Sequence, residues 1–421
     1  MKIKTLRRAF AFCAALAAGS VAAPAFATNG YIANGYGGSS KGMAGAGVAV
    51  PTGVLGLAQN PAMGLKVGNQ AGFCLTGFAP DRGFSAPPGG AVTPGSFKSR
   101  NPFFLIPCGG VNFHLNDRTT LGIFMFGNGG MNSDYLATPF NPAFGLAGTA
   151  PIGVNLEQAF LSANISYQLS DTVAIGAGPV FAFQRFSAEG LQNFAPFSSN
   201  PAALTNNGDE WSKGVGVNMG ILWEATPHLT FGASYRSKID MDKFSKYAGL
   251  FAHQGDFDIP AVATVGLAYN LPNEPRLTLT AEWQRIFYAD VPAISNSSIA
   301  NPFPFGANGG PGFGWTDMDV WRIGASFKAN DKLTLRGGVS YATQFAPSNQ
   351  TLLNILAPAT PQWHISMGAS YKLNERWGIT GSYTHAFETS VTGIHPTFNP
   401  TQPVTVRMNQ HEFALGATYR W

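Results

Sequence analysis

The sequence predicts an all-β membrane protein, a transmembrane β-barrel of fourteen antiparallel strands. Three observations predict it. Segments alternate apolar residues with small or polar ones, the connections between them are alternately very short and long, and no apolar run beyond the N-terminus approaches the roughly 18 residues of a spanning helix. An exported, lipid-facing chain without such helices can satisfy its backbone in a bilayer only as a closed barrel.

The alternation is clearest around residue 365. Trp363, Ile365 and Met367 fall on one face of a strand, whereas His364 and Ser366 fall on the other. Side chains of a strand point to opposite faces with a period of two, so this strand has one apolar and one polar surface. We therefore expect the apolar faces to contact lipid and the polar faces to line the lumen. A content of charged residues of only 11 %, against roughly 25 % in soluble proteins, agrees with this.

The alternating segments number fourteen, an even number, as single-chain bacterial barrels require. Tight turns such as 116–117 and 374–375 follow the even-numbered segments, and long connections such as 79–100 and 289–316 follow the odd-numbered ones. This asymmetry predicts short periplasmic turns, long outer loops and both termini in the periplasm of a Gram-negative cell. The predicted strands are 70–78, 101–115, 119–131, 156–169, 172–186, 211–224, 228–239, 257–269, 276–285, 317–328, 332–344, 362–372, 377–387 and 404–421.

The N-terminus has the pattern of a secretory signal peptide, residues 1–27. A basic start precedes the apolar run 9–18, and Ala25-Phe26-Ala27 forms an A-x-A cleavage site. Cleavage removes four basic and no acidic residues, so the net charge falls from +4 to 0. We therefore expect no nucleic-acid partner.

Cys74 and Cys108 are the two cysteines outside the signal peptide, and both fall on the lumen face of neighbouring strands. An exported chain can oxidise such a pair. The sequence is consistent either with a disulfide between them or with two buried thiols.

The C-terminal segment 416–421 ends in an aromatic residue and resembles the terminal recognition strand of outer-membrane barrels. That resemblance implies recognition by the barrel-assembly machinery. We expect a monomer surrounded by outer-membrane lipid and lipopolysaccharide.

Residues 28–68 do not alternate. They contain the glycine- and alanine-rich stretch 38–49 and then Asn60, Pro61 and Ala62. Together with fourteen strands and the aromatic C-terminus, this segment resembles the FadL family of outer-membrane transporters for hydrophobic compounds, which includes long-chain fatty-acid transporters and TodX-like aromatic-hydrocarbon channels. The resemblance covers essentially the whole mature chain.

The resemblance implies that residues 28–68 form a small helical hatch that plugs the barrel 69–421. It also implies capture of a hydrophobic ligand by outer loops, passage to a lumen pocket, and lateral release through a kink in the third strand near Asn60-Pro61-Ala62. The third strand contains Gly127, Gly129 and Gly130, and glycines within a strand often mark a bulge or bend. The other interpretation is that these glycines begin the outer loop.

Two long connections are rich in apolar residues and are the candidate capture loops. They could instead pack on one another to close the barrel. A carboxylate cargo would need a lumen cation, and the candidates are three arginines that could equally pair with lumen acids such as Glu282 or Glu412. The capture candidates are Leu136, Phe140, Phe144, Leu146, Phe303 and Phe305, and the cation candidates are Arg185, Arg322 and Arg336.

No catalytic motif stands out. The seven histidines lack the short spacing of a helical zinc motif, so we expect neither an enzyme nor a cofactor or metal. Passive transport of long-chain fatty acids or aromatic hydrocarbons is the favoured function. The alternatives are a general porin for hydrophilic solutes and an adhesin-like structural barrel, and the sequence leaves the choice of cargo open.

Overall fold

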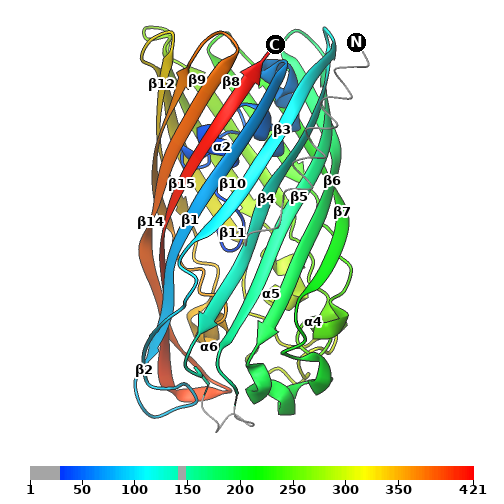
Figure 1. Cartoon of the computed structure of the whole chain (residues 1–421), viewed down its shortest axis with the longest axis vertical. Helices are drawn as coiled ribbons and strands as arrows, with labels where there is room; N and C mark the ends of the chain where they lie inside the picture. The colour runs from blue at the N-terminus through cyan, green and yellow to red at the C-terminus, as the bar shows by residue number, and fades with distance from the viewer. Residues whose placement is uncertain (1–28, 141–147) are drawn as a thin grey trace.

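The computed structural model describes residues 29–140 and 148–421, and these form a closed antiparallel β-barrel (Figure 1). The predicted signal peptide lies outside the described residues. Each strand pairs with its neighbour along the chain, and the additional pairing of β1 with β15 closes the ring. The strands are β1 (Gln70–Ala86), β2 (Gly95–Lys98), β3 (Phe104–Asn116), β4 (Thr119–Tyr135), β5 (Ile152–Gln168), β6 (Val173–Glu189), β7 (Glu210–Glu224), β8 (Leu229–Arg236), β9 (Val262–Asn270), β10 (Leu277–Ile286), β11 (Met318–Lys328), β12 (Leu333–Ala342), β13 (Trp363–Lys372), β14 (Trp377–His395) and β15 (Asn399–Arg420).

Fourteen of these strands form the wall, as the sequence predicts. The exception is β2, which pairs only with the far end of β1. The short turns and the C-terminus lie at one end of the barrel, here called the turn end, and the long connections gather at the opposite loop end (Figure 1). β1, β14 and β15 run further toward the loop end than predicted, because the cross-strand pairing of β14 with β15 continues past a bulge after Ala386.

The predicted faces are confirmed. Met367 and Ile323 on the outer surface are both 62 % exposed, whereas His364 and Arg322 are 0 % and 1 % exposed in the lumen. An outer wall of exposed apolar side chains is stable only against lipid, which identifies the environment of the barrel. Among the described residues, no helix is long and apolar enough to cross a membrane.

The helical segments are short and lie in two places, inside the barrel or in the connections at the loop end. Residues 29–68 fill the lumen toward the turn end, and Figure 1 shows α2 within the barrel. The α-helices are α2 (Gly37–Lys41), α3 (Gly64–Val67), α4 (Ala252–Gly255), α5 (Pro292–Ser295) and α6 (Thr351–Asn354). The 3-10 helices are η1 (Val54–Ala58), η2 (Pro61–Met63), η4 (Leu191–Phe197), η5 (Pro201–Ala203), η6 (Ser245–Tyr247), η7 (Tyr288–Asp290) and η8 (Ser348–Gln350).

Cys74 and Cys108 form a disulfide between β1 and β3. The two residues are cross-strand partners, with their Cα atoms 5.0 Å apart. This bond joins β3 firmly to β1, on the side away from β4.

Candidate functional site

Buried charges hold the internal segment 29–68, called the hatch below, inside the barrel. Lys41 of α2 forms an ion pair with Glu412 of β15 at 2.9 Å. The Glu282 carboxylate of β10 accepts hydrogen bonds from the backbone N–H groups of Gly47 and Val48, at 2.9 and 2.8 Å. Charge-assisted bonds of this kind, made in a site that excludes water, fix the hatch to two sides of the wall.

Asn60, Pro61 and Ala62 begin the helix η2. The Asn60 side chain accepts a hydrogen bond from the backbone N–H of Ala62 at 3.0 Å, and it donates to the carbonyl of Ile221 in β7. A Cβ atom at Gly176 of β6 would overlap the Pro61 backbone, so the wall must be small there. The motif therefore docks the hatch onto the β5–β7 side of the wall.

The glycine-rich part of β4 contains a bulge. Gly127 pairs with Ala159 and Gly129 pairs with Gln158, so Asn128 is an extra residue with no counterpart in β5. An extra residue bends the strand and increases its twist. The kink therefore lies in the glycine-rich segment that the sequence marks.

The pairing of β4 with β3 ends just before this bulge. Their pairing runs from Asn116–Thr119 to Gly109–Met125 and stops there. β3 continues to Phe104 with β1 as its only partner, and β4 continues to Tyr135 with β5 as its neighbour. The described wall thus has a gap between the two strands, on the loop-end side of Met125.

The start of the hatch covers this gap from the inside. Ile32 forms an isolated bridge with Gly129. The Gly130 N–H donates to the Tyr31 carbonyl at 3.0 Å, and the Ala33 N–H donates to the Asn128 carbonyl at 2.8 Å. The structure therefore brings the predicted glycines against residues 31–33, whereas Asn60-Pro61-Ala62 contacts β5–β7. The prediction that this motif lies near the kink is therefore wrong, because residues 31–33 of the hatch, and not 60–62, contact β4 at the bulge.

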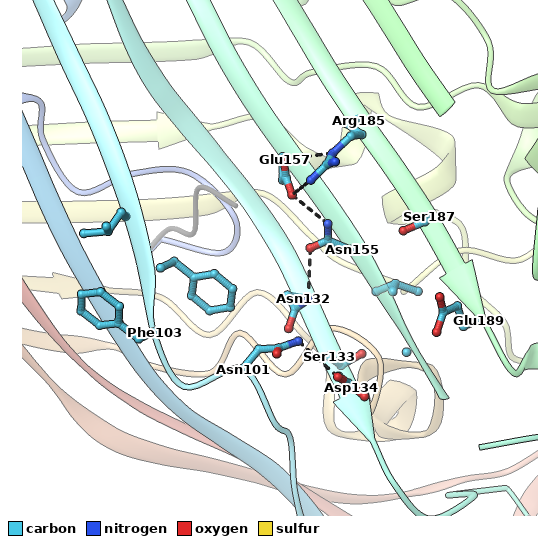
Figure 2. Close-up of a pocket in the computed structure, with 14 residues that line it drawn as sticks. Asn101, Phe103, Asn132, Ser133, Asp134, Asn155, Glu157, Arg185, Ser187 and Glu189 are labelled. Carbon is cyan, nitrogen blue, oxygen red and sulfur yellow. Dashed lines mark hydrogen bonds and ion pairs between the residues drawn. The ribbon is translucent and has the colours of Figure 1, made fainter. Parts of the chain in front are cut away.

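A cleft of about 550 Å³ opens on the outer wall where β3 and β4 diverge. Figure 2 shows a chain of side chains across its floor from Asn132 of β4 through Asn155 and Glu157 of β5 to Arg185 of β6. Phe103 lies on the β3 side of the cleft. The gap therefore meets the membrane at a cleft with one polar and one apolar rim.

A second, apolar pocket of about 40 Å³ lies among the loops at the loop end. Its lining comes from the wall, from α6 and from the long connections. An apolar cavity that binds benzene measures about 150 Å³ in an engineered protein, so a cargo must displace side chains here. The lining residues are Met131, Val154, Phe186, Leu191, Phe194, Leu250, Phe251, Ala293, Phe305, Pro311, Gly312, Phe313, Leu353 and Leu356.

The predicted capture residues separate into two groups. Phe140 and Phe305 are buried in the cluster around the apolar pocket, and Phe305 lines the pocket itself. Leu136 and Phe303 are 67 % and 53 % exposed on the surface. Phe144 and Leu146 lie outside the described residues. The loops thus pack on one another and also leave apolar side chains on their outer face.

The three predicted cations differ in their partners. Arg322 in the lumen pairs with Glu282 at 2.7 Å and also donates to Asn34, so it ties the hatch to the wall. Arg336 donates to Ser370 at 2.6 Å. Arg185 is not in the lumen, which corrects our prediction. It follows the outward series Phe181 and Phe183 on β6, and it pairs with Glu157 at 2.6 Å.

Asn128, Met131 and Tyr31 are residues of this site that the sequence did not single out. Met131 lies two residues after Gly129 and lines the apolar pocket, so pocket and gap are neighbours along β4. Only Asn128 has a local signal, its position between glycines in Gly127-Asn128-Gly129.

In the part of the chain that the structure describes, no group of three or more histidine, cysteine, aspartate or glutamate side chains could hold a metal ion. A buried Ser298–His395 pair, with Oγ and Nε2 2.8 Å apart, joins two loops. The second ring nitrogen of His395 accepts from the Phe398 N–H at 3.1 Å, so a backbone amide rather than a carboxylate orients the ring. Both side chains are buried, so the pair fastens the loops together.

A lipid-exposed barrel with a plugged lumen and a gap in its wall defines the chain as a transport protein of the bacterial outer membrane. The sequence matches the profile of the outer membrane protein transport proteins (OMPP1/FadL/TodX) over residues 14–421. The chain therefore belongs to this family.

Two bacterial proteins are similar to this chain over most of its length. A 47 kDa outer membrane protein of Pasteurella multocida is 26 % identical over 357 residues, which cover 77 % of this chain and 79 % of that protein. The long-chain fatty acid transport protein of Escherichia coli is 25 % identical over 312 residues, 64 % of this chain and 67 % of the relative.

Solved structures share the fold. The toluene transporter TodX of Pseudomonas putida superposes with a TM-score of 0.68 at 20 % identity, covering 94 % of this chain and 100 % of the transporter. A FadL homologue of Pseudomonas aeruginosa gives 0.67 at 17 % identity, covering 93 % and 99 %.

Proposed function

We propose that this protein carries hydrophobic small molecules, long-chain fatty acids or aromatic hydrocarbons, passively across the outer membrane. Cargo is captured by the apolar loops, enters the apolar pocket beside Met131, and leaves sideways through the gap between β3 and β4. The loss of pairing beyond Met125 is the observation that carries this proposal, since a sealed wall would admit no lateral route. Relatives named for toluene and for long-chain fatty acids support the two cargo classes.

Diffusion of an apolar solute into lipid is downhill, so the route needs no energy source. The cluster that surrounds the apolar pocket extends without a break to Tyr31 and Ile32, at the inner side of the gap. Movement of residues 31–33 is then the step that opens the exit. Gly129 serves this exit by letting the hatch backbone approach β4, since a Cβ atom there would overlap the Tyr31 carbonyl, and Gly127 and Gly130 flank it.

A general porin fits these observations less well. The hatch residues Met43, Leu57 and Met63 are fully buried in the lumen, which leaves little room for a water-filled channel. An adhesin would need exposed loop side chains to contact a partner. Phe140 and Trp315 of the loops are instead buried in the cluster that the loops form with one another.

We further propose that the protein works as a monomer, with lipid and lipopolysaccharide against its wall and with β15 as the strand that the assembly machinery recognises. The pairing of β1 with β15 supports the monomer, because it completes the barrel within one chain without a strand from a second copy.

Deletion of Asn128 tests the lateral route. Removing the extra residue straightens β4 and favours continued pairing with β3, so uptake of toluene and oleate into proteoliposomes should fall to the level of protein-free vesicles. Deletion of Gly89, a loop residue whose Cβ position is free of neighbours, is the matched control. A folded deletion variant that transports like the wild type would refute the lateral route, and uptake of maltose instead of toluene by the wild type would favour the porin.

A further inference from the structure

A further open cleft lies on the outer face of the loops. Its volume is about 570 Å³, within the range of small-molecule sites in proteins. Its lining shares no residue with the apolar loop pocket, so the two are separate sites. None of the described residues that line the cleft carries a charged side chain, and its polar groups are amides and a hydroxyl. The lining includes Ser199, Asn200, Gln254, Phe303 and Asn308.

Three long connections at the loop end meet to build this cleft. They are 190–209, 237–261 and 287–317. The Ser199 N–H donates to the Phe305 carbonyl at 2.9 Å, and the Gln254 N–H donates to the Gly306 carbonyl, also at 2.9 Å. A Cβ atom at Gly306 would overlap the Ala248 carbonyl. The third connection is therefore held closely between the other two, and the cleft is preformed.

Two residues of α4, which lies at the loop end in Figure 1, have a backbone conformation that residues with side chains rarely adopt. His253 and Gln254 have φ angles of 55° and 59°, in the left-handed region that glycine favours. Such a conformation costs free energy, and it occurs mostly at functional sites where the surroundings fix it. Here the N–H groups of both residues donate to the carbonyls of 306–307. The strained turn places the Gln254 side chain in the cleft.

The Gln254 side chain forms an amide pair with Asn308. Its Nε2 atom donates to the Asn308 Oδ1 atom at 2.9 Å and to the Gly306 carbonyl at 3.2 Å. Both N–H groups of Gln254 are thus used, which leaves its Oε1 acceptor and the Nδ2 donor of Asn308 for a ligand. A hydroxyl group donates and accepts at once, so neighbouring hydroxyl groups can satisfy both atoms.

An aromatic ring borders these amides. Phe303 is 53 % exposed. A Cβ atom at Gly309 would lie 2.7 Å from the Phe303 ring, so the glycine backbone supports the ring from one side. The face of an aromatic ring carries partial negative charge. It therefore attracts the C–H groups that a sugar ring presents on one face, while the hydroxyl groups of the sugar lie at its edge.

The uncharged lining selects among classes of ligand. A hydrocarbon would cover the amides without giving them hydrogen-bond partners, which costs free energy. A charged ligand would lose water and find no counter-charge on the described lining. A neutral molecule with many hydroxyl groups and one face of C–H groups matches both the amides and the ring.

We propose that this cleft binds a neutral saccharide at the cell surface. The Phe303 ring stacks on a sugar ring, and the amides of Asn200, Gln254 and Asn308 bond its hydroxyl groups. The loops of an outer-membrane barrel face the outside of the cell, where the saccharide belongs either to the surrounding lipopolysaccharide or to an external glycan. This binding function goes beyond the proposed transport and does not depend on it.

An array of immobilised neutral and sulfated oligosaccharides, probed with the full-length protein in detergent micelles, tests the site. Neutral glycans should bind and sulfated ones should not be preferred. Phe303→Leu keeps an apolar side chain but removes the ring, so the best neutral glycan should bind about 3- to 10-fold more weakly, whereas Phe303→Tyr should bind it like the wild type. Asn308→Ala should weaken it by a similar factor. Phe387→Leu, which changes an exposed phenylalanine of β14 outside the cleft, is the matched control.

A second arm distinguishes the two sources of the saccharide. The polysaccharide released by mild acid from the lipopolysaccharide of the bacterium that encodes this protein is titrated calorimetrically. Binding in this arm identifies the surrounding membrane as the source, and binding on the array alone identifies an external glycan.

Absence of binding in both arms would overturn the site, as would a preference for sulfated glycans. Wild-type binding in both Phe303→Leu and Asn308→Ala would overturn it too. Both side chains are exposed, so neither change removes buried packing, and the comparison of neutral with sulfated glycans needs no variant. Toluene uptake by the wild type tests the transport function separately.

Discussion

Gly129→Ala perturbs most directly the contact of hatch residues 31–33 with residues 128–130 of β4, called the seal below. A Cβ atom at residue 129 would overlap the backbone carbonyl of Tyr31, and a backbone atom cannot rotate away. The substitution should therefore lift residues 31–33 away from β4. It removes the Gly130–Tyr31 and Ala33–Asn128 backbone hydrogen bonds, at 3.0 and 2.8 Å.

Each hydrogen bond is worth about 1 kcal/mol net, so the seal loses about 2 kcal/mol. Every 1.4 kcal/mol is a factor of ten, which makes the open state about 30-fold more populated. The start of the hatch stays anchored because the Tyr288 hydroxyl accepts from the Tyr31 backbone N–H at 3.2 Å and donates to the Asn29 carbonyl at 2.6 Å. The expected opening is thus local.

Amide hydrogen exchange measures this opening directly. The Ala33 and Gly130 amides should exchange about 30-fold faster in Gly129→Ala, while the amides of the other wall strands remain protected. Gly337→Ala is the matched control, because its Cβ atom would meet only the Ser366 carbonyl, at 3.8 Å. Wild-type exchange at Ala33 in a folded Gly129→Ala variant would refute the seal. Faster toluene uptake by that variant would link the seal to release.

Three further outcomes follow from the structure. Replacing both Cys74 and Cys108 by serine reopens a loop of 34 residues and should lower the free energy of unfolding in urea by about 4 kcal/mol; an unchanged midpoint contradicts a stabilising disulfide. Arg322→Met leaves the buried Glu282 carboxylate without its counter-charge and should cost about 3–5 kcal/mol in the same assay, more than the double change with Glu282→Gln. Burial lowers the pKa of His395, at the loop end, to about 4, below its ordinary 6.5, so its stabilising contact is complete above pH 6.5 and lost as the pH falls toward 4; loop amide exchange, corrected for its intrinsic rate, should rise in the wild type and not in His395→Gln.

Much of the wall could be predicted from the sequence because its code is local. The period of two in segments such as 363–372 assigns each side chain to lipid or lumen without knowledge of the partner strand. The same rule applies to Arg185. It continues the parity of Phe181 and Phe183, so its outward position was available from the alternation.

Which lumen arginines pair with an acidic side chain could not be predicted from the sequence. The charge of Arg322 is compensated because the β10–β11 register places it opposite Glu282, and the long connection 287–317 between these strands gives no local indication of that register. Arg236, the last residue of β8, has no carboxylate within 4.0 Å in the part of the chain that the structure describes. Neither residue has a sequence signal that separates the two cases.

By itself the sequence determined a closed antiparallel barrel of fourteen strands and its two faces, since alternation and turn lengths act over neighbouring residues, whereas the hatch before β1 was expected only from the family resemblance. Only the tertiary structure decided where the pairing of β3 with β4 stops and which hatch residues lie against the kink. β3 and β4 stop pairing at Gly109 and Met125, and just beyond that point the Asn128 bulge of β4 lies against the hatch backbone, a contact between segments about 100 residues apart.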